Sequence, residues 1–436
     1  MPQNIDLELK SFPIELANAY SLSKISISKF LDHDQMIEWA NLGLKIAHLR
    51  KGVRSWELAV KFYQVSPSVC KLIPYNYFYE WMQQGLLISK KSKPIADSFF
   101  SNSPNTVAVL RSRHLDEWVQ MGLGLYTGIW KSTNLATTFF QTGDQLLRSS
   151  NITTLKPTIS TIKKLSIHSY EAAAECMKLL PEILTLIPEK KTEYIELIDL
   201  VITNNWQHTK SFIEISIQSF GNTNLSCRNE LIKLLVLIVS YRKTNISNWL
   251  STYANCVQDI DNSYHSDLIN SSKYILNKTT PEILLDYIKS LPFVSQRVSA
   301  NKINIWVDAG IEIYSENEIA GASFFRKEST KSIDLIDKLS SVVDLEQQKN
   351  KLELYCIALT GNQIELTSRD EIDSKNIGWG ISEFATTEGE TIYLPSQSNE
   401  YNSKEDNNSW YKVIATHQTG HIESVSYTHL TLPTKA

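Results

Sequence analysis

Two histidines late in the chain have the spacing of a metal site on a helix. His417 and His421 lie four residues apart in the segment HQTGHIE, and Glu423 follows two residues later. Histidines at positions i and i+4 of a helix can both bind one divalent metal ion, as in the H-E-x-x-H motif of zinc peptidases. Two histidines and one carboxylate would leave a coordination position open, so we consider His417, His421 and Glu423 a candidate zinc site.

The general base of such a peptidase is missing from its expected position. In H-E-x-x-H, the glutamate after the first histidine deprotonates the metal-bound water. Gln418 stands there in this chain, and an amide has no useful basicity near neutral pH. We therefore expect no hydrolysis by that mechanism even with zinc bound. Two alternatives stay open: an ordinary solvated or packed histidine pair, and a third metal ligand from beyond the end of the chain instead of Glu423.

The elements that position this segment begin with an internal repeat. Three segments read W-x3-G-L, each is followed by an aromatic pair, and a fourth copy runs from Trp306 to Phe325. The first three begin at Trp39, Trp81 and Trp118, and their aromatic pairs are Phe62-Tyr63, Phe99-Phe100 and Phe139-Phe140. A period near 40 residues fits two antiparallel helices per unit. Tryptophan and glycine four residues apart share a helical face, so the glycine would let a neighbouring helix approach closely.

These repeats predict the fold of most of the chain. We expect each aromatic pair to close the second helix of its unit, and Ser66-Pro67 and Ser103-Pro104 to cap and begin the next helix. Residues 155–300 lack the Trp-Gly pattern but keep apolar residues three and four apart, and Thr280-Pro281 is typical of a helix start. The prediction is a mainly α fold with a helical-repeat, α-solenoid-like array over residues 10–360. An irregular helical bundle is the alternative, and in both the Trp and Phe residues form core.

The character of the sequence changes after Thr360. Helical periodicity fades, GETIYLP alternates like a short strand, and NSKEDNNS is typical of a loop. The helix SWYKVIATHQTGHIE then follows, and we expect Trp410, Val413, Ile414 and His417 along one of its faces. The expected domains are Trp-Gly helical repeats over 1–150, a further helical array over 151–300, a returning repeat over 301–360, a small α+β subdomain over 361–423 that carries the histidines, and a tail over 424–436.

Composition and charge exclude several classes of protein. The net charge of −4 gives no sign of a nucleic-acid binder, although residues 301–410 carry 20 acidic against 10 basic side chains. Five cysteines without a CxxC pair favour reduced, buried thiols in an intracellular protein. The amino-terminal segment lacks a signal-peptide pattern, and the longest apolar run, LLVLIVS, is too short to span a membrane. We expect a cytoplasmic protein without a membrane span. Walker, G-x-S-x-G, GxGxxG and D-x-S-x-S motifs are absent from the sequence.

Four segments resemble one known protein family. They are WVDAGIEIYSENEIAGASFFRKESTKSIDLIDKLSS, LELYCIALTGNQIEL, TTEGETIYLP and WYKVIATHQTGHIE. They are similar to the nitric oxide reductase activation protein (NorD) and Rubisco-activation accessory protein (CbbO) family, and the resemblance covers roughly residues 30–423. It implies a non-enzymatic adaptor: a helical part followed by a von Willebrand factor A-type domain, which works with a MoxR-type AAA+ ATPase to activate or remodel a target enzyme, often a metalloenzyme.

This chain departs from the family pattern after Glu423. The family would continue into the von Willebrand domain, where a D-x-S-x-S ligand set would bind Mg²⁺, whereas residues 424–436 read SVSYTHLTLPTKA. We interpret these residues as a non-native tail, so the target-docking domain is expected to be missing. Two other functions stay open: a metal-dependent hydrolase that uses the H-x3-H helix, and a generic helical-repeat interaction module without an ATPase.

Overall fold

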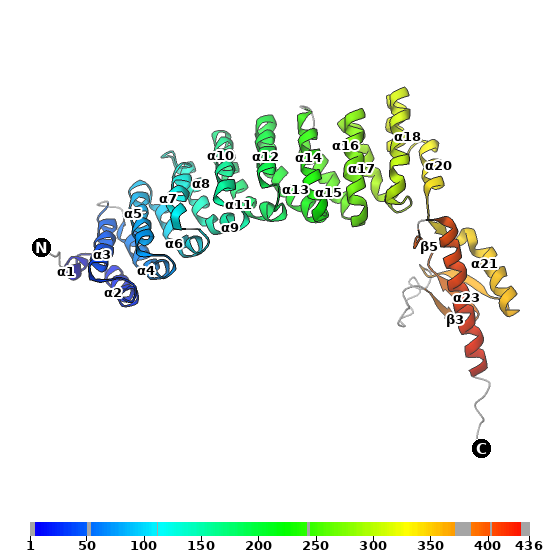
Figure 1. The fold of residues 1–436 in the computed structure, drawn as a ribbon, viewed down its shortest axis with the longest axis horizontal. Helices are drawn as coiled ribbons and strands as arrows, with labels where there is room; N and C mark the ends of the chain where they lie inside the picture. Colours follow the sequence, from blue (N-terminus) through cyan, green and yellow to red (C-terminus); the bar gives the residue numbers. More distant parts are fainter. Residues whose placement is uncertain are drawn as a thin grey trace, which may run out of the picture. The chain divides into compact units, whose positions relative to one another are not determined.

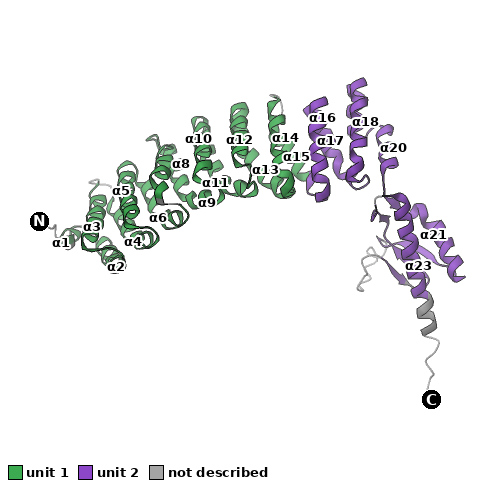
Figure 2. Cartoon of the chain, viewed as in Figure 1, with its two compact units in different colours: residues 1–255 green, residues 256–436 purple. Residues whose placement is uncertain are grey.

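The computed structural model describes residues 5–49, 54–110, 112–241, 245–370, 385–401 and 403–428. The chain divides into two compact units, residues 1–255 and 256–436 (Figure 2). The predicted mainly α fold is confirmed: helices follow one another in an array, and a small sheet region lies in the second unit (Figure 1). None of the described helices combines the length and the apolar character needed to cross a bilayer.

The first unit consists of helices joined by short turns. They are α1 (Ile5–Leu9), α2 (Ile14–Ile27), α3 (His33–Ala47), α4 (Trp56–Leu72), α5 (Tyr75–Lys91), α6 (Lys93–Val109), η1 (Ser112–His114), α7 (Leu115–Leu123), α8 (Trp130–Gln141), α9 (Gly143–Ser149), α10 (Ile152–His168), α11 (Tyr170–Leu186), α12 (Lys191–Asn205), η2 (Trp206–His208), α13 (Thr209–Asn222), η3 (Leu225–Cys227), α14 (Arg228–Ser240) and α15 (Ile246–Val257). The turn expected at IPEKK falls between α11 and α12, as predicted.

These helices stack in two layers. One layer places α2, α4, α6, α8, α11 and α13 in successive contact, and the other does the same with α3, α5, α7, α10, α12 and α14. Figure 1 shows the helices of the second set standing side by side with similar directions. Each helix pair therefore packs mainly on the pairs before and after it, which is the packing of an α-solenoid.

The tryptophan–glycine contact, which comprises a tryptophan, the glycine four residues later and the following aromatic pair, forms the core of the early repeats. In the second repeat, Trp81 stacks on Phe99 with ring centroids 6.2 Å apart and meets Phe100 edge-on at 5.7 Å. A Cβ atom added to Gly85 would lie 2.5 Å from Cε1 of Phe100. Because no larger residue fits without movement, the glycine is required for this approach. Trp39, Trp81, Trp118 and their aromatic pairs are all buried, as expected.

The prediction for the Ser-Pro dipeptides was wrong. Pro67 and Pro104 lie inside α4 and α6 rather than in a first turn, and the aromatic pairs before them stand in mid-helix. Proline removes one backbone donor from the helix. The neighbouring serine compensates locally, because Ser103 Oγ donates to the carbonyl of Phe99 (2.6 Å) and accepts from Trp81 Nε1 (2.8 Å). Thus Ser103 holds the tryptophan of its own repeat.

The second unit continues with helices before its strands. They are η4 (Asn262–Tyr264), α16 (His265–Lys278), α17 (Pro281–Ser295), η5 (Ala300–Lys302), α18 (Ile303–Glu316), α19 (Glu318–Phe325), α20 (Thr330–Leu339) and α21 (Leu345–Thr360). Pro281 is the first residue of α17, as predicted, although the Thr280 side chain makes no capping bond. The fourth repeat has the same contact as the others, since a Cβ on Gly310 would lie 2.6 Å from Cζ of Phe325.

The predicted α+β subdomain is present in the second unit. Its strands are β1 (Val343–Asp344), β2 (Glu365–Ser368), β3 (Thr386–Glu388), β4 (Thr391–Leu394) and β5 (Gln397–Ser398). β4 lies between β2, to which it is parallel, and antiparallel β3, while β1 pairs with β5. The core also includes Leu345, Leu352 and Cys356, so the subdomain begins before Gly361, where the sequence placed it. Gly378 and Gly380 lie outside the described residues.

Replacing Gly85 with alanine tests the tryptophan–glycine contact. We expect Gly85→Ala to lower the free energy of unfolding by roughly 1–3 kcal/mol, because the new methyl group overlaps the Phe100 ring. Gly221→Ala is the matched control in α13: its added Cβ meets nothing within 4 Å, and the better helix propensity should stabilise by up to about 1 kcal/mol. Urea unfolding monitored by circular dichroism measures both. Equal effects of the two substitutions would contradict the contact.

Two buried thiols predict a loss of stability at alkaline pH. Burial raises the pKa of Cys70 to about 11 and that of Cys176 to about 12, against roughly 8.5 in an unfolded chain. The folded state therefore retains protons that the unfolded state releases, so the free energy of unfolding should fall as the pH rises from about 8.5 to 11. Urea titrations across this range under reducing conditions measure the slope. Cys176→Ala should reduce it by up to about one proton, and an unchanged slope would contradict the assignment.

Candidate functional site

The histidine-bearing helix is α23 (Lys404–Thr428). The sequence placed NSKEDNNS in a loop, but the helix begins inside this segment. Ser403 explains the start: its Oγ accepts from the backbone N–H of Asp406 (3.1 Å) and donates to the carboxylate of that residue (2.7 Å). Glu405 and Asp406 also place negative charge in the first turn, where it stabilises a helix. The backbone is helical as far as Thr428, beyond the predicted boundary at Glu423, and the proposed tail from 429 to 436 lies outside the described residues.

The buried face of α23 is not the one that the sequence predicted. It consists of Asn407, Tyr411, Ala415 and Thr419, four residues apart, with Trp410 and Ile414 partly buried beside them. Val413 is 67% exposed and His417 is exposed, so neither belongs to the packed face. The apolar residues of this helix follow two adjacent stripes, and Tyr411 outweighs Val413 because its ring packs into the subdomain core while its hydroxyl donates to the carbonyl of Pro395 (2.8 Å).

A buried asparagine that sequence reasoning missed anchors this helix. Asn407 is fully buried, and its Oδ1 accepts from the backbone N–H of Tyr401 (2.9 Å) and from Ser398 Oγ (3.2 Å). Its Nδ2 donates to the carbonyls of Ser341 (2.8 Å) and Tyr401 (2.7 Å). Such a fully bonded amide fixes α23 to β5 and to the chain after α20. The only sequence signal was an asparagine four residues before Tyr411, on what became the packed face.

The two histidines lie together on the exposed side of α23. Their Nε2 atoms are 3.1 Å apart and their ring centroids 4.6 Å apart, with the rings nearly perpendicular. Without a metal, one Nε2–H can donate to the other nitrogen. Zinc binds imidazole nitrogen at about 2.0–2.1 Å, so two nitrogens of a tetrahedral site lie roughly 3.3–3.4 Å from each other. The pair is therefore close to the spacing that one zinc ion requires of two ligands.

The third predicted ligand is not brought to this pair by the helix. The Glu423 side chain lies outside the described residues, but its position on α23 is roughly 120–160° around the axis from His417 and His421. Residues at i and i+2 do not face each other on a helix. Among the described residues, no group of three or more His, Cys, Asp or Glu side chains gathers as a metal site would require. The zinc site at His417, His421 and Glu423 stays a prediction.

The other histidines support the helical array rather than a second site. His48 contacts Glu8 (3.0 Å), His168 stacks on Trp206, and buried His265 approaches the carbonyl of Ile260 (3.3 Å). Burial lowers the pKa of His265, which favours the neutral ring. These are the ordinary packed and surface roles that the sequence led us to expect.

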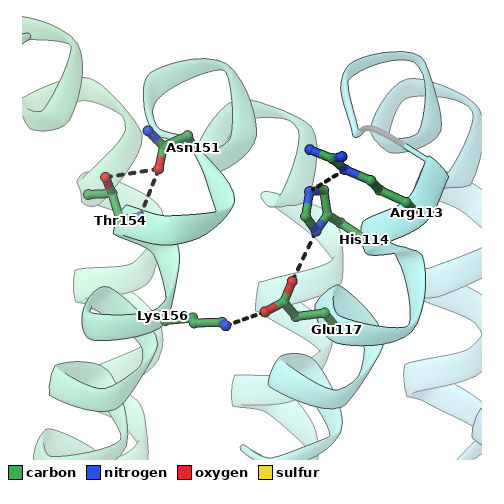
Figure 3. A network of polar contacts seen from close by, with 6 residues as sticks. All are labelled: Arg113, His114, Glu117, Asn151, Thr154 and Lys156. Atoms are coloured by element: carbon green, nitrogen blue, oxygen red, sulfur yellow. Dashed lines mark hydrogen bonds and ion pairs between the residues drawn. The ribbon is translucent and has the colours of Figure 1, made fainter.

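A polar chain in the first unit connects α7 to α10 (Figure 3). Arg113 Nε donates to His114 Nε2 (3.2 Å), and His114 Nδ1 lies 3.1 Å from a carboxylate oxygen of Glu117. Lys156 of α10 pairs with the other oxygen of Glu117. Hydrogen bonds from Lys156 and, to a lesser extent, from His114 lower the pKa of Glu117.

This chain borders a cavity of about 450 Å³, whose lining includes Leu110, Arg113, His114, Leu147 and Asn151. The Asn151 side chain accepts from the backbone N–H of Thr154 (2.8 Å) and caps α10. Each charged group in the chain therefore has a partner from its own or the adjacent helix. The arrangement suits a bridge between successive helix pairs, and at this exposure it stabilises the fold by about 1 kcal/mol or less.

Comparison with known proteins adds no relative: no protein-family model, curated protein or solved structure matches this chain.

Asn407→Ala tests the anchor of α23. We expect a loss of roughly 2–4 kcal/mol in the free energy of unfolding of the second unit, because the buried partners of the amide would lose their hydrogen bonds. Ser409→Ala, two residues later on the exposed side of the same helix, should change stability by less than about 0.5 kcal/mol. Hydrogen exchange of α23 amides in the two variants reports the effect directly. Equal protection in both would contradict this role for Asn407.

Proposed function

We propose that this chain is a non-enzymatic adaptor of a MoxR-type AAA+ ATPase system that activates or remodels a target metalloenzyme. The helical-repeat array is the observation that carries the proposal. Repeat arrays of this kind present long rows of exposed side chains, and proteins use them chiefly to bind other proteins. The resemblance of residues 30–423 to the NorD and CbbO family supplies the ATPase and the target enzyme as the expected partners.

The aromatic residues of the repeats support a scaffold over a cofactor-binding protein. Trp39, Trp81, Trp118 and Trp306 are all buried against aromatic side chains of the same array. They are used for packing and leave no aromatic surface for a cofactor. The candidate zinc pair on α23 is exposed and has glutamine in place of the general base, which supports an adaptor over a hydrolase.

The exposed side of α21 is a suitable protein-binding surface. Leu354, Tyr355 and Leu359 are 67%, 38% and 49% exposed. They lie at positions i, i+1 and i+5 of one helix and so share a face. Grouped exposed apolar residues mark interaction sites more often than single ones do. We assign this face to contact with the ATPase, while the repeats hold the target enzyme.

Binding to the ATPase tests both the function and this surface. The chain should form a complex with the MoxR-type ATPase of the same organism, detected as a mass increase by light scattering, and should change its ATP turnover. Leu354→Ser with Leu359→Ser should weaken binding at least about tenfold, since each removes an exposed apolar contact. Ile167→Ser, at an isolated site that is 81% exposed in the first unit, is the matched control and should bind like the parent.

Absence of any complex with the parent chain would contradict the adaptor function. Equal weakening by the α21 variant and by Ile167→Ser would contradict the assignment of the α21 face alone. A pull-down dominated by a partner that is not an ATPase would favour the generic helical-repeat interaction module.

A further inference from the structure

We propose that His417 and His421 are one half of a zinc site that is completed by the same two histidines of a second copy of this chain. The inference goes beyond the adaptor function and does not depend on the ATPase, because it concerns how two copies associate through α23.

The distance between the two nitrogen atoms supports metal binding. The Nε2 atoms already face each other at 3.1 Å. This is about 0.2–0.3 Å from the spacing of two nitrogens in a tetrahedral zinc site, so small side-chain rotations suffice to bind the ion. The histidines need no change in the helix, since both lie on one side of α23, one turn apart.

The number of ligands points to a second molecule. Structural zinc sites have four protein ligands, and the described residues bring no third His, Cys, Asp or Glu to this pair. The position of Glu423 turns away from the histidines around the helix. A twofold axis through the ion doubles two histidines to four, and closed twofold dimers are the commonest oligomers. Four neutral imidazoles are a suitable ligand set for zinc.

Access to the pair supports a partner helix. Both histidines are exposed, and so is Val413 one turn before His417. A Cβ added to Gly420, between the two histidines in sequence, would meet nothing within 4 Å. The packed side of α23, with Asn407, Tyr411 and Ala415, is used within its own unit. A second α23 can therefore approach the histidine side without displacing any contact of the subdomain core.

Sedimentation velocity of the full chain during zinc titration tests the proposal. Metal is first removed with EDTA and the chelator is dialysed away. We expect a monomer that becomes a dimer as zinc is added, with saturation at about one zinc per two chains. His417→Ala and His421→Ala should each stay monomeric. His33→Ala, at an exposed histidine far away in sequence, should dimerise like the parent. Both histidines of the pair are exposed, so the variants should keep the parent circular dichroism spectrum.

Cobalt substitution gives an independent reading of the ligands. Co²⁺ in place of zinc should give the intense visible absorption of a tetrahedral ion in the parent and only the weak spectrum of the aqueous ion in His417→Ala. Three results would overturn the proposal. They are a zinc-bound monomer with one ion per chain, no zinc uptake by the parent, and dimers that persist after removal of both histidines. A monomer that loses its zinc in Glu423→Gln would instead assign the third ligand to Glu423.

Discussion

The close approach of a glycine to a pair of aromatic rings is the contact on which the repeats depend. Four residues before each glycine stands a tryptophan, and the rings that cover the glycine also stack against this indole. At Gly122 the distances from an added Cβ to the rings of Phe139 and Phe140 would be 2.6 Å, and at Gly310 the ring of Phe325 is equally close. A helix with a larger side chain at this position would stand further away, and the indole would lose its partners. One glycine per repeat thus fixes the distance between the two helices of a pair.

Because the large apolar side chains are used in this way, polar side chains are left to connect one helix pair to the next. Gln84 donates to Asp116 (2.8 Å), Lys156 pairs with Glu117, and Lys164 binds Asp199 (2.8 Å). Each exposed pair contributes about 1 kcal/mol or less. The stability of the array therefore rests on the buried rings, while its surface residues are free to serve partners. That separation of roles is what an adaptor needs.

The fold could be predicted from the sequence wherever a residue type has one physical use. Trp81 and Gly85 on one helical face required a close helix partner, and Pro281 required a helix start. The sequence failed where two uses compete. Pro104 could begin a helix or lie inside one, and the hydrogen bonds of Ser103 decided for the second. Likewise, Asn407 belongs to a segment of turn-forming residues, and only the carbonyls of Ser341 and Tyr401, distant in sequence or on an irregular segment, show why it is helical and buried. The spacing of His417 and His421 was sufficient to bring them together, but the side of α23 that they occupy depends on how Tyr411 packs.

A double-mutant cycle between Gly85 and Phe100 tests most directly whether the glycine–aromatic contact holds the array together. The free energy of unfolding is measured for the parent, Gly85→Ala, Phe100→Leu and the double variant. Leucine lacks the ring atoms that the new methyl group would meet, so Phe100→Leu should accommodate the alanine, and the two effects should be non-additive by about 1–2 kcal/mol. Additive effects would mean that Gly85 and Phe100 stabilise the protein independently, and the contact would not be the constraint that spaces the helices.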